Sequence, residues 1–260
     1  MALIEPPKAQ YAQIATELRR RIDSGAYPPG SAFPSEPRLA DELGVSRVTV
    51  NKAITLLRAS GDVKVRRGSG TFVRSLPRIT RDAVGRYAAR MEGSGAGEVE
   101  VRKLNLQSFT KYREIARISC SEQVATHLGL EPGQDVLVRR RVLYANAEPT
   151  QIADSYYPWS IAGQSKALMR EDAGQGGSYA RLADLGHGPA WFAEDIVSRT
   201  PDEAEQRLLE IEPTQQVFEI WHVAYTGQDL PVELGVHVMP VHLWKLRYRW
   251  NDPPAGRAAR

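Results

Sequence analysis

The stretch SRVTVNKAITLLRASGDVKVRRGSGTFV, residues 46–73, shows two different periodicities in succession. Its first half places apolar residues at helical spacing, so that four of them share one face. The residues on that face are Val50, Ala53, Ile54 and Leu57. Gly61 ends the pattern, and the β-forming runs DVKV and TFV then flank a glycine-rich tip. The stretch therefore predicts a helix capped by Ser46, followed by a β-hairpin.

Two more helices are expected before this stretch. The first runs over residues 10–24, where apolar residues recur at a period of 3.6 until Gly25. The second begins after a Ser35 cap and ends at Gly44. A short turn then leads directly into the third helix, which makes a helix-turn-helix, and the hairpin makes it a winged helix-turn-helix. The last helix of such a motif enters the major groove of DNA.

The polar residues at the start of the third helix have the chemistry that DNA contact requires. Ser46 and Thr49 can bond phosphate, and Arg47 can reach a guanine edge. Asn51 and Lys52 continue the exposed face. The tip of the hairpin adds Arg66, Arg67, Ser69 and Gly70 as candidates for phosphate or minor-groove contact.

Two alternatives without DNA contact can also explain these residues. Ser35 and Ser46 can serve mainly as helix caps. The charge of the region can also belong to a solvated surface. Residues 1–90 carry 16 Lys and Arg against 8 Asp and Glu, whereas residues 91–260 carry 18 against 23. This split indicates a basic module that meets a polyanion, joined to a slightly acidic body.

Composition excludes several other classes of protein. There is no apolar run of about 18 residues, and Pro6 and Pro7 interrupt the region where a signal peptide needs its apolar stretch. We expect a cytoplasmic protein. The only cysteine, Cys120, excludes an intrachain disulfide and is expected to be buried.

The C-terminal half contains an internal repeat. Residues 131–158 align with residues 212–240, and each copy follows a predicted amphipathic helix. Each copy reads as strand, tight turn, strand and proline, so two helix-plus-hairpin units are expected. Two copies predict a pseudo-symmetric α+β domain.

Equivalent inward positions of the two hairpins are expected to form a ligand site. Arg139 and Arg141 share one strand face, and Gln151 and Glu233 are equivalent in the repeat. Ser178 opens a helix whose N-terminus can hold an anion. The alternative for the arginines is a solvated edge strand. The tryptophans at 221, 244 and 250 are expected in a core or an interface.

Residues Tyr11 to Val73 resemble the DNA-binding domain of GntR-type bacterial transcription regulators. The motifs PSE, LA, LGVSR, TV and GSGTFV occur in the family's order. The resemblance implies DNA contacts by Ser35, Arg38, Ser46, Arg47, Thr49, Asn51 and the wing tip. Two positions depart, because Pro37 and Asn51 stand where arginine is common. Asn51 shifts the expected base preference toward adenine.

Residues 100–250 resemble the effector-binding UTRA domain of the HutC-type branch of these regulators, whose fold is similar to that of chorismate lyase. Arg141 and Glu233 match its ligand-binding positions. Trp244 stands where a ligand-binding tyrosine is common, Leu143 where a second arginine is common, and Ala153 where a glutamate is common. These departures favour an effector that is less charged than a phosphorylated sugar.

We therefore expect an α+β protein with four parts. These are a winged helix-turn-helix (1–75), a linker (76–99), an effector-binding and dimerisation domain (100–252) and a flexible tail (253–260). The expected function is a dimeric repressor that binds a palindromic operator and is released by a small effector. The first alternative is a constitutive DNA-binding protein whose second domain only dimerises. The second, an enzyme, is disfavoured because the histidines lack metal-ligand spacing and no catalytic or nucleotide-binding motif occurs. No cofactor is expected.

Overall fold

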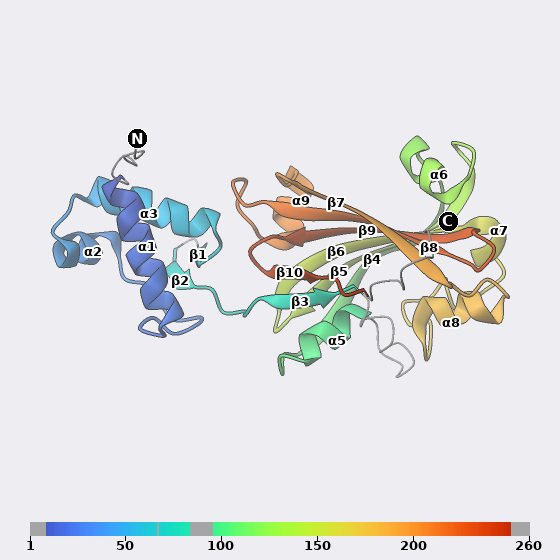
Figure 1. Ribbon diagram of the computed structural model, residues 1–260, viewed down its shortest axis with the longest axis horizontal. Helices are drawn as coiled ribbons and strands as arrows, with labels where there is room; N and C mark the ends of the chain where they lie inside the picture. Colours follow the sequence, from blue (N-terminus) through green and yellow to red (C-terminus); the bar gives the residue numbers. More distant parts are fainter. Residues whose placement is uncertain (1–8, 67, 84–95, 251–260) are drawn as a thin grey trace, which may run out of the picture. The chain divides into compact units, whose positions relative to one another are not determined.

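The computed structural model of the chain describes residues 9–66, 68–83 and 96–250. They form two compact units (Figure 1). The first contains the described residues up to Arg78 together with Ser198–Phe218 and Pro240–Leu243. The second contains the rest of the described chain. Segments of the C-terminal half therefore contribute to both units.

The first unit is built on a winged helix-turn-helix, as predicted. Its elements are α1 (Gln10–Asp23), α2 (Glu36–Leu43), α3 (Arg47–Ala59), β1 (Val63–Arg66) and β2 (Gly70–Val73). Gly44 ends α2 with a φ of 64°, a conformation that suits glycine. Two residues later, Ser46 Oγ accepts a hydrogen bond from Thr49 N at 3.1 Å and caps α3. The expected helix boundaries are thereby confirmed to within about one residue.

A single apolar core holds the three helices and the wing together. Leu18, Leu39, Val50 and Leu57 have no exposed surface, and Val63 and Val73 close the core from the hairpin. Each buried side chain of this size stabilises the fold by about 1.5–3 kcal/mol relative to exposure. Because Val50 and Leu57 share one face of α3, the opposite face of the helix is exposed to solvent.

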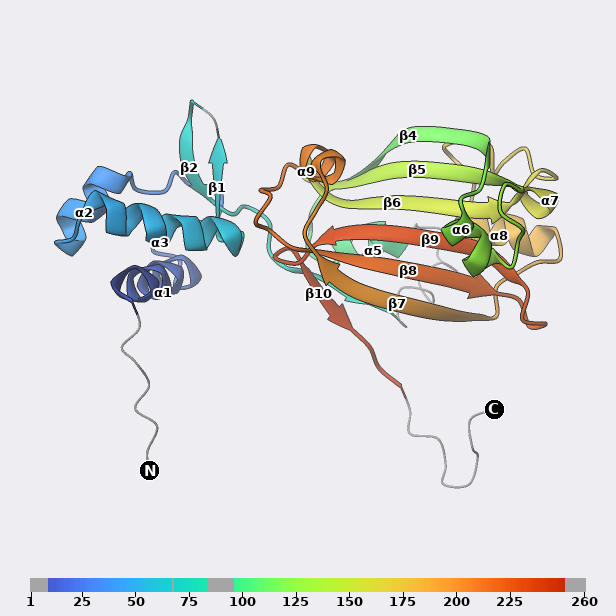
Figure 2. The ribbon, with the colours of Figure 1, turned by 90° about the horizontal axis from the view of Figure 1, so that it is seen from above.

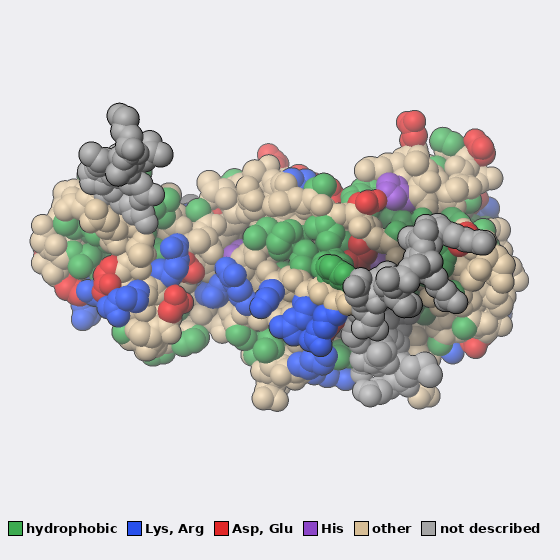
Figure 3. All heavy atoms as spheres, in the orientation of Figure 1, with side chains coloured by type: hydrophobic (Ala, Val, Ile, Leu, Met, Phe, Trp, Pro, Cys, Tyr) green, Lys and Arg blue, Asp and Glu red, His purple; other side chains and the backbone are tan. Residues whose placement is uncertain are grey.

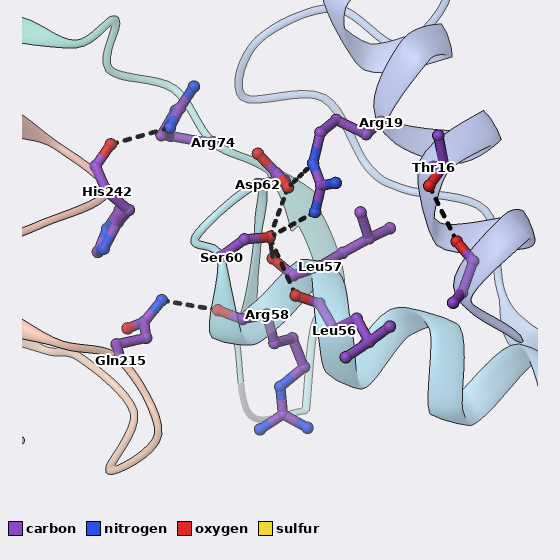
Figure 4. A network of polar contacts seen from close by, with 11 residues as sticks. Thr16, Arg19, Leu56, Leu57, Arg58, Ser60, Asp62, Arg74, Gln215 and His242 are labelled. Atoms are coloured by element: carbon purple, nitrogen blue, oxygen red, sulfur yellow. Dashed lines mark hydrogen bonds and ion pairs between the residues drawn. The ribbon is translucent and has the colours of Figure 1, made fainter. Parts of the chain in front are cut away.

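Hydrogen bonds fix the C-terminal end of α3 within this unit (Figure 4). Asp62 accepts a bond from Arg19 Nε of α1 at 2.8 Å and one from the Ser60 hydroxyl at 2.6 Å. Gln215 Nε2 donates to the Arg58 carbonyl at 2.8 Å. The helix end is thus bonded both to α1 and to a segment that lies far away in the sequence.

His242 makes a second long-range contact in the first unit. Its carbonyl accepts a hydrogen bond from Arg74 Nη1 at 3.1 Å (Figure 4). Its ring lies so close to Gly61 that a Cβ on that glycine would stand 2.2 Å from His242 Cγ. Burial and the neighbouring charge of Arg74 lower the pKa of His242 to about 4. The ring is therefore neutral near pH 7.

A six-stranded sheet with the order β4-β5-β6-β9-β8-β7 dominates the C-terminal half (Figure 2). Its strands are β4 (Ser108–Ser119), β5 (Asp135–Ala145), β6 (Glu148–Pro158), β7 (Trp191–Arg199), β8 (Val217–Tyr225) and β9 (Pro231–Pro240). The helices of this half are α5 (Ala96–Arg102), α6 (Glu122–Leu128), α7 (Trp159–Ala162), α8 (Gly177–Asp184) and α9 (Glu203–Leu209). The α+β fold class is confirmed.

The predicted repeat is visible in the topology. A strand, a helix and a hairpin occur as β4-α6-β5-β6 and again as β7-α9-β8-β9. The two copies meet where β6 pairs antiparallel with β9, in a register from Ile152↔Val238 to Tyr156↔Leu234. The last strands of the two hairpins therefore lie side by side at the centre of the sheet.

The two faces of this sheet differ in chemistry. Helix α6 packs Val124 and Leu128 into an apolar cluster with Val136 and Leu234, and Cys120 is buried there as expected. Because side chains alternate along a strand, the residues that flank Leu234 point to the other face. That face carries the polar groups described below.

One further pair of strands was not predicted. Strand β3 (Ile79–Asp82) pairs in parallel with β10 (Trp244–Arg247). The stretch expected as a linker, residues 76–99, therefore includes a strand and the start of α5. Residues 84–95 and the predicted tail at 253–260 lie outside the described residues. Within the described parts of the chain, no helix is long and apolar enough to cross a membrane.

Gly61 and Gly44 form a matched pair for testing the His242 contact. Both have left-handed φ values, 68° and 64°, but nothing lies within 4 Å of a Cβ at Gly44. The variant G44A is expected to lose about 1 kcal/mol of unfolding free energy, and G61A clearly more, because the His242 ring must also move. Urea denaturation measures both values, and equal losses would contradict the contact.

The depressed pKa of His242 predicts an acid-sensitive contribution to stability. The unfolded chain takes up this proton near pH 6.5, whereas the folded protein resists it until about pH 4. The stabilising contribution is therefore fully present above about pH 6.5 and is lost as the pH falls toward 4. Unfolding free energies measured across this range should fall less steeply for H242Q than for the wild type. Identical slopes would refute the assignment.

Candidate nucleic-acid interface and ligand site

The α2–α3 corner presents arginines that make no internal bonds. Arg38 on α2 and Arg47 at the start of α3 are exposed, and neither forms a side-chain hydrogen bond or ion pair with the described residues. Ser35 occupies the N-cap position of α2, but its side chain makes no cap bond, contrary to the capping alternative. Its exposed hydroxyl and the two guanidinium groups are thus available to an external partner.

The other predicted residues of α3 have internal partners. The hydroxyl of Thr49 lies 2.8 Å from that of Ser46, which already caps the helix. Asn51 Nδ2 donates to Glu36 Oε1 at 2.8 Å. Lys52 Nζ lies 5.9 Å from the centre of the Tyr11 ring. These contacts orient polar groups on the exposed face of the helix.

The wing has the form that the sequence predicts. β1 and β2 pair antiparallel from Val63↔Val73 to Arg66↔Gly70. The guanidinium of Arg66 stacks over the Phe72 ring at 4.6 Å, while Ser69 and Gly70 are exposed. Arg67 lies outside the described residues. The wing therefore presents a cation next to a tip whose glycines permit close approach of the backbone.

The positive charge of the first unit is partly compensated elsewhere. Glu17 forms ion pairs with Arg20 at 2.8 Å and Arg21 at 2.9 Å, and Arg21 also pairs with Glu42 at 2.5 Å. The hydrogen bond from Arg20 is the main reason why the pKa of Glu17 falls to about 2. Figure 3 shows basic and acidic side chains beside each other on this unit. Unpaired arginines therefore distinguish the α2–α3 corner from the α1 surface.

The second candidate site is a buried polar cluster on the face of the sheet opposite α6. Its members come from strands of the six-stranded sheet, from helix α8 and from strand β3. They are Arg81, Tyr112, Arg139, Arg141, Gln151, Ser155, Tyr157, Tyr179, Glu194, His222, Glu233 and His237. We call this set the polar cluster.

At the centre of the polar cluster, Tyr157 Oη donates to Glu233 Oε1 at 2.6 Å. Burial by itself raises the pKa of Glu233, but hydrogen bonds from Tyr157 and Tyr179 and nearby positive charge outweigh it, so the pKa lies below its usual value. Arg141 Nη2 donates to the Ser155 hydroxyl at 2.7 Å. The cluster thus holds a buried carboxylate near a half-buried arginine.

Arg139 is fully enclosed and has a different set of partners. Its Nη1 donates to the carbonyls of Leu168 and, at 2.5 Å, Arg170, and its Nη2 donates to Glu171 O at 3.0 Å and Tyr112 Oη at 2.8 Å. These bonds fix the segment that follows α7. Although Arg139 and Arg141 share a strand face as predicted, only Arg141 retains exposed surface.

Eight members of the polar cluster were not predicted, and four of these interact with one another. Arg81 is paired in a buried ion pair with Glu194, and His222 Nδ1 lies 3.0 Å from the same carboxylate. Tyr179 Oη lies 3.3 Å from His222 Nε2. Burial opposes ionisation of Glu194, but the hydrogen bonds from His222 and Arg81 outweigh it and lower its pKa. These residues come from four separate segments, so no local motif signals them.

The remaining predicted ligand residues are placed as follows. Gln151 Nε2 bonds His237 Nδ1 at 2.8 Å, so Gln151 joins the cluster through β9. Ser178 is partly exposed in the first turn of α8. Trp244 is 3% exposed and donates from Nε1 to Thr150 O at 2.7 Å, as in a core position. No group of three or more metal-ligating side chains occurs among the described residues.

Comparisons with known proteins give the same division of the chain. Residues 10–73 match the family model described as bacterial regulatory proteins, gntR family, and residues 103–242 match that of the UTRA domain. An uncharacterised HTH-type transcriptional regulator of Streptomyces coelicolor is 30% identical over 256 residues, which cover 95% of each chain. The histidine utilization repressor of Pseudomonas putida is 30% identical over 250 residues, 95% of this chain and 94% of the repressor.

Solved structures agree on the fold. PhnF from Mycobacterium smegmatis has a TM-score of 0.58 at 22% identity, over 92% of this chain and all of that one (100%). Another GntR-family regulator reaches a TM-score of 0.62 at 24% identity, over 95% and 99% of the two chains. The chain therefore belongs to the GntR family of bacterial transcription regulators, in the HutC branch that joins a winged helix-turn-helix to a UTRA domain, and it is a DNA-binding regulator, not an enzyme.

Proposed function

We propose that the protein is a homodimeric repressor that binds a palindromic operator in the cytoplasm and leaves it when a small effector binds at the polar cluster. The observation that carries the proposal is the buried carboxylate of Glu233 close to Arg141, an oppositely charged residue that is only half-buried. The similarity to a histidine utilization repressor supports repression as the direction of control.

On the DNA side, α3 enters the major groove and the wing meets the backbone or the minor groove. The proposal keeps all predicted DNA contacts, namely Ser35, Arg38, Ser46, Arg47, Thr49, Asn51, Lys52, Arg66, Arg67, Ser69 and Gly70. The unpaired state of Arg38 and Arg47 supports it, because no internal bond has to break when DNA binds. Two protomers related by a two-fold axis place two such helices about 34 Å apart on an inverted repeat.

On the effector side, Arg141 offers donors and Glu233 offers an acceptor. A ligand with both an acceptor group and a donor or cationic group fits this pair. Gln151 and Ser178 are further proposed contacts. The bonds of Arg139 and Trp244 to backbone carbonyls favour a positioning role for both. Leu143 and Ala153 add no charge, so a phosphorylated sugar fits less well than a ligand of low net charge.

The effector acts by shifting a population of conformations. It stabilises the arrangement to which it binds more tightly, and its differential affinity sets the size of the shift. Strand β9 carries Glu233 and His237 and ends two residues before His242, which packs on Gly61. Strand β8 carries His222 and begins two residues after Gln215, which bonds the end of α3. These strands are the proposed route to the recognition helix.

The burial of Trp244 favours a second candidate function. If the chain's own side chains fill the ligand site, the C-terminal domain only dimerises and DNA binding is constitutive. An effector screen separates the two candidates, because no compound would release the constitutive protein from its operator.

Replacing Arg47 or Arg66 with Ala is expected to weaken DNA binding in two different ways. R47A should lose about 1–3 kcal/mol on the operator and much less on random DNA, whereas R66A should weaken both and lower the salt slope by about 1. The matched control is R20A, because Arg20 is exposed but paired with Glu17 on α1. Mobility shifts at several salt concentrations measure these effects. Equal losses for R47A on the two DNAs would remove its assigned role.

The polar cluster is tested with E233Q and a panel of amino acids, organic acids and sugar phosphates. A compound that releases operator DNA from the wild type is expected to leave E233Q bound, because the amide cannot supply the carboxylate charge. E203Q changes an exposed glutamate on α9 and should respond like the wild type. Circular dichroism and unaltered operator affinity confirm that E233Q is folded. Equal release from E233Q would contradict the assignment of the site.

A further inference from the structure

The recognition helix carries an exposed apolar side chain that the predicted contacts do not include. Val48 is 66% exposed, and it lies on the face of α3 opposite the buried Val50, Ala53 and Leu57. A single exposed valine needs no explanation by itself. Val48 is, however, three residues before Asn51, and side chains at this spacing are neighbours on one helix face.

The hydrogen bond that Asn51 donates to Glu36 fixes how Asn51 presents its amide. A carboxylate only accepts hydrogen bonds, so the 2.8 Å contact assigns Nδ2 to the side of Glu36. One Nδ2 hydrogen is used there. The carbonyl Oδ1 and the second Nδ2 hydrogen remain, which gives one acceptor and one donor on the exposed amide.

One acceptor beside one donor matches the major-groove edge of adenine. Adenine offers the N6 amino donor and the N7 acceptor, whereas guanine offers two acceptors, O6 and N7. Asn51 cannot turn two donors toward guanine without breaking its bond to Glu36, and the Glu36 carboxylate adds a further acceptor nearby. Guanine is therefore disfavoured at this position.

We infer that Val48 and Asn51 together read A·T base pairs in each half-site, with Asn51 bonded to adenine and Val48 against a thymine methyl group, while Glu36 acts as a positioning residue for Asn51. The inference rests on the proposed entry of α3 into the major groove. It deepens that function by assigning the chemistry of the bases that are read.

Single-atom changes in the DNA test the two contacts in the full-length protein. Deoxyuridine in place of thymidine removes only the methyl group, and 7-deazaadenine removes only the N7 acceptor. At one thymine of the half-site, deoxyuridine should lower the DNA affinity of the wild type about fourfold. The same change in the DNA should leave the affinity of V48A unaltered. At one adenine, 7-deazaadenine should cost the wild type about tenfold and should not affect N51A.

Glu36 is tested through base preference. The wild type should prefer adenine over guanine at the Asn51 position by at least about fivefold, and E36A should reduce this ratio while the preference at the Arg47 position is kept. E36Q retains an acceptor oxygen and should rescue the ratio. K52A, on the same helix face, should weaken all sequences equally and leave the ratio unchanged.

The outcomes separate this inference from the proposed function. If the wild type binds no sequence better than random DNA, the proposed function fails. If it binds a defined half-site but tolerates both analogues at every position, or if V48A and N51A are as sensitive as the wild type, the inference is overturned and the regulator stands. An E36A ratio equal to that of the wild type would overturn the role of Glu36.

Discussion

The antiparallel pairing of β6 with β9 is the constraint on which the C-terminal half depends. It joins two copies of one strand–helix–hairpin unit into a single sheet and places their equivalent positions at the seam. Tyr157 from one copy thereby bonds Glu233 from the other, and Gln151 bonds His237. A shift of register by one residue would turn these polar side chains to the apolar face beneath α6. The register therefore decides whether the polar cluster exists.

The polar cluster is costly for stability, which bears on its role. Burying ionised groups such as Arg81 and Glu194 requires their removal from water, and an ion pair returns only part of that free energy. An apolar layer of similar volume would serve a purely structural sheet at least as well. This cost is consistent with the proposed role of Glu233 and Arg141 in ligand recognition.

Local patterns predicted the parts of the fold that local chemistry determines. The Ser46 cap, the glycines around α2 and α3, the wing and the helix-plus-hairpin repeat follow from spacing in the sequence, and the structure confirms them, whereas the expected cap bond of Ser35 is absent. The β3–β10 pair was missed because it joins short segments about 165 residues apart, and no local pattern records such a pairing. The places of Arg81, Glu194 and His222 in the polar cluster could not be predicted for the same reason, because these residues are far apart in the sequence. The bonds that enclose Arg139 come from a loop whose path the sequence does not reveal.

The proposed reading of a specific inverted repeat by the α2–α3 corner is tested by a footprint on the DNA upstream of the protein's own gene. It should be made with the full chain at about 0.15 M salt, beside random DNA of equal length. We expect protection of an inverted repeat with half-site centres about 34 Å apart, at protein concentrations that leave random DNA unbound. Equal and salt-labile binding to both DNAs would contradict sequence-specific reading and leave the basic unit as a non-specific anchor.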